Sequence, residues 1–181
     1  MYNFSDTKVL VVEDMPPMLE LTKSLLGIFG FGAVYGAAHA KEGYALFQSH
    51  KPDLVLTDWA LEDMDGIALT EKIRTDKLSQ NPYVPIVIMT GFGSKPRVEA
   101  ARDAGVTEFL VKPFTSKDLY ARIVQVIEKP RPFVESGDFF GPDRRRRKNM
   151  NYEGRCRRQS ERPSNEDTEF LIDMQDAISQ I

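Results

Sequence analysis

The chain has 181 residues, 41% of them hydrophobic and 28% charged, so it can bury one full core with some sequence left over. Its single cysteine excludes an internal disulfide and a cysteine-rich zinc site, and its two histidines leave oxygen atoms as the expected ligands of any metal, which favours hard cations such as Mg²⁺. Because no apolar run is long enough for a membrane span or a leader, we expect a cytoplasmic protein.

The net charge of −3 is distributed unevenly along the chain. Lys, Arg, Asp and Glu give a net charge of −5 over residues 1–143, +7 over residues 144–162 and −5 over residues 163–181. Such blocks are typical of a globular part followed by an interaction tail, so we expect the composition to change near residue 143.

Five short apolar runs alternate with five amphipathic segments over the first two thirds of the chain. The predicted strands cover residues 8–12, 33–35, 54–58, 86–90 and 108–111. The first predicted helix begins near Asp14 or Met15, the second covers residues 39–47, and the third opens at Gly66. The fourth covers residues 96–104 and is closed by Gly105, and the fifth follows a cap at Thr115. This alternation predicts an α/β fold with a parallel sheet built from right-handed crossovers.

Polar residues stand where four of these strands end. Glu13 and Asp14 follow the first strand, Asp58 ends the third, Thr90 ends the fourth, and Lys112 follows the fifth. An isolated acid such as Asp58 would most simply cap a turn, but the carboxyl ends of parallel strands meet at one edge of a sheet, where ligands bind. Three carboxylates repel one another unless a cation lies among them. The sequence therefore predicts a site that holds Mg²⁺ together with a phosphoryl group.

Four motifs around these positions resemble the signature of the CheY-like response-regulator receiver family. They are Val11-Val12-Glu13-Asp14, Leu56-Thr57-Asp58, Met89-Thr90-Gly91 and Val111-Lys112-Pro113-Phe114. The resemblance covers roughly residues 5–129, and we assign residues 1–129 to a receiver domain. It implies a flavodoxin-like (βα)5 fold, a doubly wound parallel sheet with the strand order 2-1-3-4-5.

The resemblance also implies a role for each residue of the site. Asp58 would be the nucleophile that takes a phosphoryl group from a phosphohistidine on a histidine kinase or phosphotransfer protein. Asp14, Asp58 and the backbone carbonyl of Ala60 would hold Mg²⁺, and Glu13 would act through a metal-bound water. Lys112 would pair with a phosphoryl oxygen, and its peptide bond to Pro113 would be cis.

Switching is implied by two further residues. In the family a hydroxyl, here Thr90, moves toward the phosphoryl group, and an aromatic side chain, here Phe109, fills the space that it leaves. Two departures from the family pattern are Phe109, where tyrosine is also common, and Glu13, where aspartate is frequent. Neither removes a required ligand. A downstream protein would bind the face made by the fourth helix, fifth strand and fifth helix, and dimerisation of the phosphorylated form is left open.

Residues 130–181 are predicted to form an appendage with a turn-rich linker, an arginine-rich segment and an acidic amphipathic helix. Seven arginines are candidates for binding an anion or a nucleotide: Arg144, Arg145, Arg146, Arg147, Arg155, Arg157 and Arg158. This extension is similar to that of the Cle proteins, which implies binding of cyclic di-GMP. A solvated disordered linker, an RNA site and a site for an acidic partner remain alternatives. DNA binding is not expected, because too few aliphatic residues follow for a helix-turn-helix core.

Residues 166–181 place five apolar side chains on one helical face: Phe170, Met174, Ala177, Ile178 and Ile181. A helix this short is marginal in water, so we expect it to dock on the receiver, on a second copy or on a partner.

The sequence as a whole predicts a stand-alone response regulator that is a phosphoacceptor and not an enzyme. The alternative is an effector that responds to cyclic di-GMP through the arginine-rich segment. A small-molecule enzyme is disfavoured, because no histidine stands at the predicted strand ends and no glycine-rich phosphate loop is present.

Overall fold

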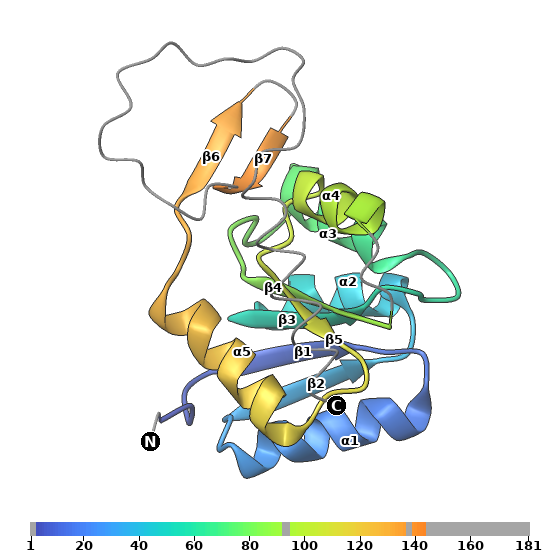
Figure 1. Ribbon diagram of the computed structural model, residues 1–181, viewed down its shortest axis with the longest axis vertical. Coiled ribbons are helices and arrows are strands. Elements are labelled where there is room, and N and C mark those ends of the chain that lie inside the picture. The colour runs from blue at the N-terminus through green and yellow to red at the C-terminus, as the bar shows by residue number, and fades with distance from the viewer. Residues whose placement is uncertain (1–2, 92–94, 137–138, 144–181) are drawn as a thin grey trace.

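A computed structural model describes residues 3–91, 95–136 and 139–143 of the chain. Its centre is a parallel sheet of five strands in the order β2-β1-β3-β4-β5 (Figure 1), which confirms the predicted order. The strands are β1 (Lys8–Val12), β2 (Ala33–Ala37), β3 (Leu54–Asp58), β4 (Ile86–Thr90) and β5 (Glu108–Val111). Order and parallel pairing place β1, β3 and β4 inside the sheet, and these strands are almost wholly apolar because both of their faces are covered.

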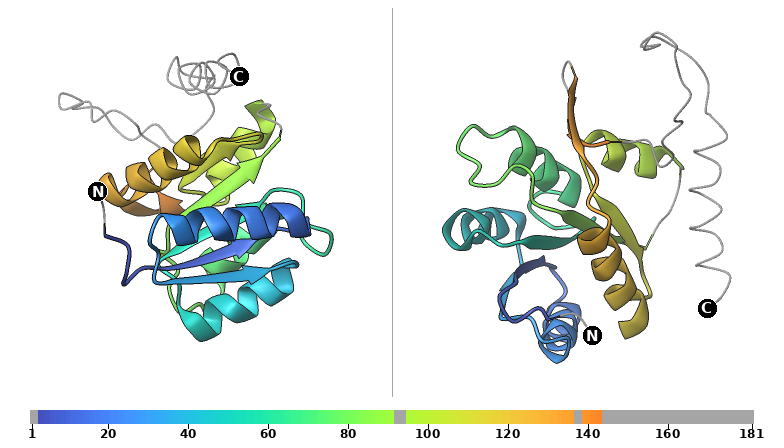
Figure 2. Two further views of the ribbon diagram at one scale, coloured as in Figure 1. Left: turned by 90° about the horizontal axis from the view of Figure 1, so that it is seen from below. Right: turned by 90° about the vertical axis from the view of Figure 1, so that its left-hand side faces the viewer.

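Helices cover both faces of the sheet (Figure 2). The helices are α1 (Pro16–Ile28), α2 (Ala40–His50), α3 (Gly66–Thr75), α4 (Lys95–Asp103) and α5 (Ser116–Glu128). One core cluster joins α1 and α5 to the sheet through Leu26, Leu119 and Ile123. Two others join α2 and α3 through Phe47 and Leu69, and α4 to β4 and β5. The alternation predicted from the sequence is therefore confirmed, with helices on each side as in a doubly wound fold.

Local sequence sets several helix ends. Met15 is the N-cap of α1 and two prolines follow it, in the first positions of the helix, where no amide donor is needed. Thr115 caps α5 in a reciprocal capping box with Asp118. Gly105 follows α4 with a φ of +89°, a left-handed conformation that favours glycine. All three ends were predicted from the sequence.

The segment after α5 differs from its prediction. Residues 136–143 were expected to be a turn-rich linker, but the structure has an antiparallel pair, β6 (Phe133–Ser136) and β7 (Phe139–Pro142). The signal was in the sequence, since two runs that contain aromatic residues are separated by two residues, Gly-Asp, a frequent hairpin sequence. The prediction of a turn-rich linker was wrong at Ser136 and at residues 139–142, and the strands were missed because the hairpin is short and contains a glycine and a proline.

This pair of strands, the C-terminal hairpin, packs on the receiver beside α3 and α4 (Figure 1). The rings of Phe133 and Phe140 lie 5.6 Å apart, and each lies about 5 Å from the ring of Tyr83 in edge-on contact. Gly141 and Gly105 approach so closely that a side chain on Gly141 would meet the backbone of Gly105. The hairpin therefore belongs to the folded unit.

Arg74, near the end of α3, is a buried cation under the C-terminal hairpin. Only 4% of it is exposed, and its Nε and Nη1 donate to the backbone carbonyls of Gly105 (3.1 Å) and Pro82 (2.7 Å). The ring of Phe133 lies 5.1 Å from its guanidinium carbon. Burial lowers the pKa of Arg74 to about 9, so the side chain keeps its charge at neutral pH. Arg74 thereby joins α3, two loops and the hairpin.

A second attachment runs from β5 to the segment that leads into the hairpin. Glu108, the first residue of β5, is buried, and its carboxylate lies 3.8 Å from Arg131 and 3.6 Å from Arg122. Gln125 of α5 donates to the same carboxylate at 3.2 Å. A buried carboxylate needs such partners, and here they come from α5 and from the extension.

Among the residues that the structure describes, no helix is long and apolar enough to cross a membrane. The arginine-rich segment and the acidic helix over residues 166–181 lie outside the described residues, so the expectations for them stay predictions.

Candidate functional site

The predicted polar residues come together at the carboxyl edge of the sheet. Glu13 and Asp14 directly follow β1 and Asp58 ends β3, and these strands are neighbours. A carboxylate oxygen from each of Glu13, Asp14 and Asp58 lies within 4.8 Å of the other two. Glu13 is fully buried, Asp58 is 8% exposed and Asp14 is half-buried, so most of the cluster is shielded from solvent.

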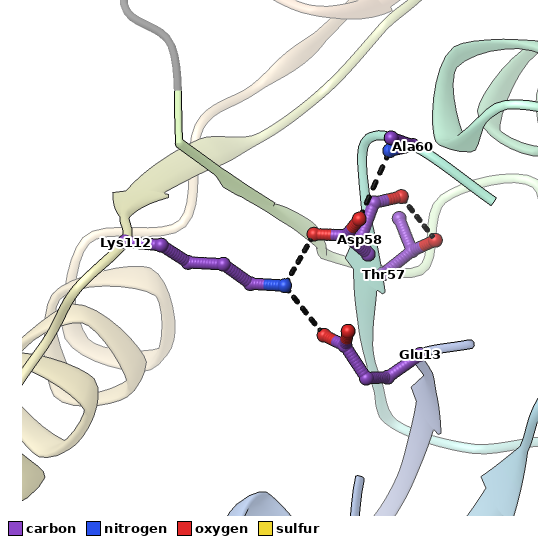
Figure 3. A network of polar contacts seen from close by, with 5 residues as sticks. All are labelled: Glu13, Thr57, Asp58, Ala60 and Lys112. Atoms are coloured by element: carbon purple, nitrogen blue, oxygen red, sulfur yellow. Dashed lines mark hydrogen bonds and ion pairs between the residues drawn. The ribbon is translucent and has the colours of Figure 1, made fainter. Parts of the chain in front are cut away.

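Lys112, which directly follows β5, reaches across to this cluster (Figure 3). Its ammonium nitrogen donates to Oε2 of Glu13 at 2.6 Å and lies 2.5 Å from Oδ1 of Asp58. The peptide bond from Lys112 to Pro113 is cis, as predicted. The lysine therefore bridges two of the three carboxylates and partly offsets their repulsion.

The charges of this cluster change its acidity. Burial raises the pKa of the Glu13 carboxyl, the carboxylates of Asp58 and Asp14 add to the effect, and the bond from Lys112 only partly opposes it. Burial works to lower the pKa of Lys112, but its bonds to Asp58 and Glu13 outweigh burial and raise it. The other oxygen of Glu13, Oε1, is buried and accepts no hydrogen bond from any residue that the structure describes. Such an orphaned oxygen is suited to accept a hydrogen bond from a metal-bound water.

The loop after β3 holds Asp58 in place. The backbone amide of Ala60 donates to Oδ2 of Asp58 at 3.0 Å, and the hydroxyl of Thr57 donates to the backbone carbonyl of Asp58 at 3.1 Å. Gly66 opens α3 so close to that carbonyl that a side chain at this position would collide with it. Asp65 caps α3 by accepting from the amide of Ala68. The start of α3 thus abuts the end of β3.

Thr90 and Phe109, the predicted switch pair, lie on neighbouring strands. Thr90 ends β4 and is buried, and its carbonyl accepts from the amide of Lys112 at 2.7 Å. Phe109 is also buried and packs with Val98 of α4 and Ile88 of β4. The ring of Phe109 therefore lies inside the fold in this structure, against α4.

Comparison with known proteins places this arrangement in a family. Residues 9–124 match the response regulator receiver domain. The chain belongs to this family. A curated relative, the chemotaxis protein CheY1 of Helicobacter pylori, is 35% identical over 121 residues, which cover 66% of this chain and 96% of the relative. The solved structure of the chemotaxis response regulator CheY4 of Vibrio cholerae is 28% identical, with a TM-score of 0.62 over 66% of this chain and 98% of that chain.

A longer relative matches this receiver over part of its length. The phosphate regulon transcriptional regulatory protein PhoB of Pseudomonas aeruginosa is 28% identical over 124 residues, so the match spans 53% of PhoB. Receiver domains act in two-component signalling, where they are phosphoacceptors on an aspartate, bind Mg²⁺ at an acidic pocket and interact with histidine kinases and downstream effectors. The described residues of this receiver include an acidic cluster of that composition.

Two contacts near the site were not predicted. The direct bond between Lys112 and Glu13 was missed because the two residues are 99 positions apart. No role was predicted for Asp63, whose carboxylate accepts hydrogen bonds from the amides of Ala40 and Lys41. Its acceptance of hydrogen bonds from another helix has no local signal in the sequence.

Replacing Glu13 with glutamine is expected to stabilise the metal-free receiver by about 1 kcal/mol at neutral pH. A raised pKa means that the fold opposes the charged form of Glu13, and glutamine keeps an oxygen for Lys112 without the charge. The measurement is urea unfolding with a chelator present. Glu71→Gln, at an exposed acid on α3, is the control, and a loss of stability in Glu13→Gln would contradict the expectation.

Proposed function

We propose that this receiver accepts a phosphoryl group on Asp58 in a reaction that depends on Mg²⁺, and that this event switches a surface for protein binding. The observation that supports the proposal most directly is the bridge from Lys112 to Asp58 and Glu13 inside a cluster of three carboxylates. A lysine in that position can exchange its ion pair with the carboxylate of Asp58 for an ion pair with an oxygen of an incoming phosphoryl group.

In the proposed reaction an oxygen of Asp58 attacks the phosphorus of a phosphohistidine. The new oxygen–phosphorus bond forms as the nitrogen–phosphorus bond breaks, and the imidazole leaves. The amide of Ala60 keeps the carboxylate oriented, and Lys112 pairs with one oxygen of the phosphoryl group. Asp14, Asp58 and the carbonyl of Ala60 would hold Mg²⁺, with Glu13 acting through a bound water. When bound, the metal would neutralise part of the negative charge on the transferred phosphoryl group.

The proposed switch uses the same strands. The hydroxyl of Thr90 would bind the phosphoryl group, and Phe109 would respond to its movement. Because Phe109 packs against α4, a change at its ring would reach the surface made by α4, β5 and α5. A downstream protein is proposed to read that surface, and a histidine kinase or phosphotransfer protein is the proposed donor. We infer that the protein works in the cytoplasm.

The test is phosphorylation of the full chain by acetyl phosphate, followed by intact mass and by fluorescence of Trp59, the only tryptophan. Trp59 directly follows Asp58 and is half-buried against the core cluster that contains Val98 and Phe109, with Arg97 5.6 Å from its ring, so it lies well placed to report changes at the site. We expect a gain of one phosphoryl group with Mg²⁺ and none with a chelator. A native chain that gains no phosphoryl group in the presence of Mg²⁺ would show the proposal to be wrong.

A further inference from the structure

The loop between β3 and α3 is tied to the beginning of α2 by one side chain. Asp63 accepts hydrogen bonds from the amides of Ala40 (2.8 Å) and Lys41 (3.0 Å), the first two residues of α2. His39, the N-cap residue of α2, makes no capping hydrogen bond through its own side chain within the described part of the chain. The cap that α2 lacks locally is therefore supplied by a residue 23 positions further along the chain.

The charge of Asp63 suits this place. Partial desolvation works to raise the pKa of its carboxyl, but the hydrogen bonds from Ala40 and Lys41 outweigh it and hold the pKa below the ordinary value. Asp63 is thus ionised at neutral pH, and its charge lies at the positive end of the α2 dipole.

The loop that Asp63 holds is the loop that carries Ala60. The first part of the loop is fixed by the hydrogen bond from the amide of Ala60 to Asp58. The side chain of Leu61 is buried in the core cluster that contains Phe47 of α2. Its last part is fixed where Asp65 caps α3. Asp63 holds the middle of the loop, next to Glu62, whose side chain is exposed.

The other side of this contact leads to Glu13. The amide of Glu13 donates to the carbonyl of Ala37 at 3.0 Å, and the amide of Ala38 donates to Glu42 of α2 at 3.1 Å. Residues 37–41 therefore connect two parts of the site. Ala37 contacts the backbone of Glu13, and Ala40 and Lys41 contact Asp63 in the loop that carries Ala60. Asp63 joins the surroundings of two groups that the proposed metal site needs.

We propose that Asp63 is a positioning residue for the divalent-cation site. By holding the loop on α2, Asp63 fixes the carbonyl of Ala60 relative to Glu13. It also fixes the hydrogen bond that the amide of Ala60 donates to Asp58. The inference rests on the proposed function, because it assigns Asp63 to the metal site that serves phosphorylation of Asp58. A group one shell beyond the ligands acts by this kind of support.

The test compares Asp63→Ala with Asp76→Ala in the full chain. Asp76 is the matched control: it also accepts two hydrogen bonds, from the hydroxyl of Tyr44 on α2 (2.7 Å) and from the amide of Leu78 (2.9 Å). It follows α3 and therefore lies at the opposite edge of the sheet from Asp58. Three quantities are measured: the dissociation constant for Mg²⁺ from Trp59 fluorescence, the free energy of unfolding in a chelator, and amide hydrogen exchange at Ala40 and Lys41.

We expect both variants to lose stability, and only Asp63→Ala to bind Mg²⁺ about tenfold more weakly. Asp63→Asn, which keeps one acceptor oxygen, is expected to recover part of the affinity. Hydrogen exchange at Ala40 and Lys41 is expected to speed up in metal-free Asp63→Ala and not in Asp76→Ala. An Asp63→Ala variant that is less stable but binds Mg²⁺ with native affinity would overturn the inference, because Asp63 would then be a helix cap alone.

Failure of the proposed function gives a different result. A native chain that binds Mg²⁺ with no phosphoryl uptake from acetyl phosphate would contradict phosphorylation at Asp58, while the comparison of Asp63→Ala with Asp76→Ala would still decide the positioning role. A native chain whose Trp59 fluorescence and hydrogen exchange do not respond to Mg²⁺ would overturn the inference about Asp63.

Discussion

Replacing Asp58 with asparagine is expected to abolish phosphorylation by acetyl phosphate, with a fall in rate of about a thousandfold or more. Asparagine has nearly the shape of aspartate and keeps an oxygen for the amide of Ala60, so the loop after β3 should stay in place. It lacks the negative charge and the nucleophilic oxygen that the reaction needs. Because one of three carboxylates is lost, Mg²⁺ should also bind about tenfold more weakly.

The measurement is intact mass after incubation with Mg²⁺ and acetyl phosphate, with Asp76→Asn at the opposite edge of the sheet as the control. Thermal unfolding of both variants shows whether they are folded. Uptake of a phosphoryl group by a folded Asp58→Asn chain would refute the assignment and would direct attention to Asp14 or Glu13 as acceptor.

Replacing Arg74 with methionine is expected to cost about 3 kcal/mol of unfolding free energy. Methionine fills much of the same space but donates no hydrogen bond, so the carbonyls of Gly105 and Pro82 lose their donors inside the fold. The cation–π interaction with the ring of Phe133 is lost too. Since these three partners belong to different segments, the loss should loosen the C-terminal hairpin as well as the end of α3.

Urea unfolding measures this cost, and Phe133→Ala gives a second leg. The double variant should lose less than the sum of the two single losses, because Arg74 and Phe133 are in contact. Lys72→Met is the matched control, since this exposed lysine lies on the same helix over the ring of Tyr44 at 4.6 Å and should cost under about 1 kcal/mol. Equal effects of Arg74→Met and Lys72→Met would contradict the role given to Arg74.

Much of the fold was predictable because its cause is local. The apolar runs that became β1, β3 and β4 are continuous since both faces are covered, and proline, threonine and glycine mark the ends of α1, α5 and α4. Strand order was not readable from alternation and came from the resemblance to a family. The positions of Glu13, Asp58 and Lys112 followed from the rule that parallel strands end at one edge.

What escaped prediction depends on contacts between distant segments. The acceptance by Asp63 of amides from α2, and the donation by Arg74 to two loops, join residues that no local pattern relates. The C-terminal hairpin is a different case. Its two strands are too short to be stable alone, and only their packing on Arg74, Tyr83 and Gly105 makes them part of the fold.

Ion pairs lie at the two ends of β5. At its carboxyl end Lys112 contacts Asp58, and at its first residue Glu108 contacts Arg131, which leads into the hairpin and from there to the arginine-rich extension. Four residues of strand separate these ends by about 13 Å. The two ion pairs therefore lie at opposite ends of one strand, so β5 is a structural element shared by the site at Asp58 and by the segment that leads into the C-terminal hairpin.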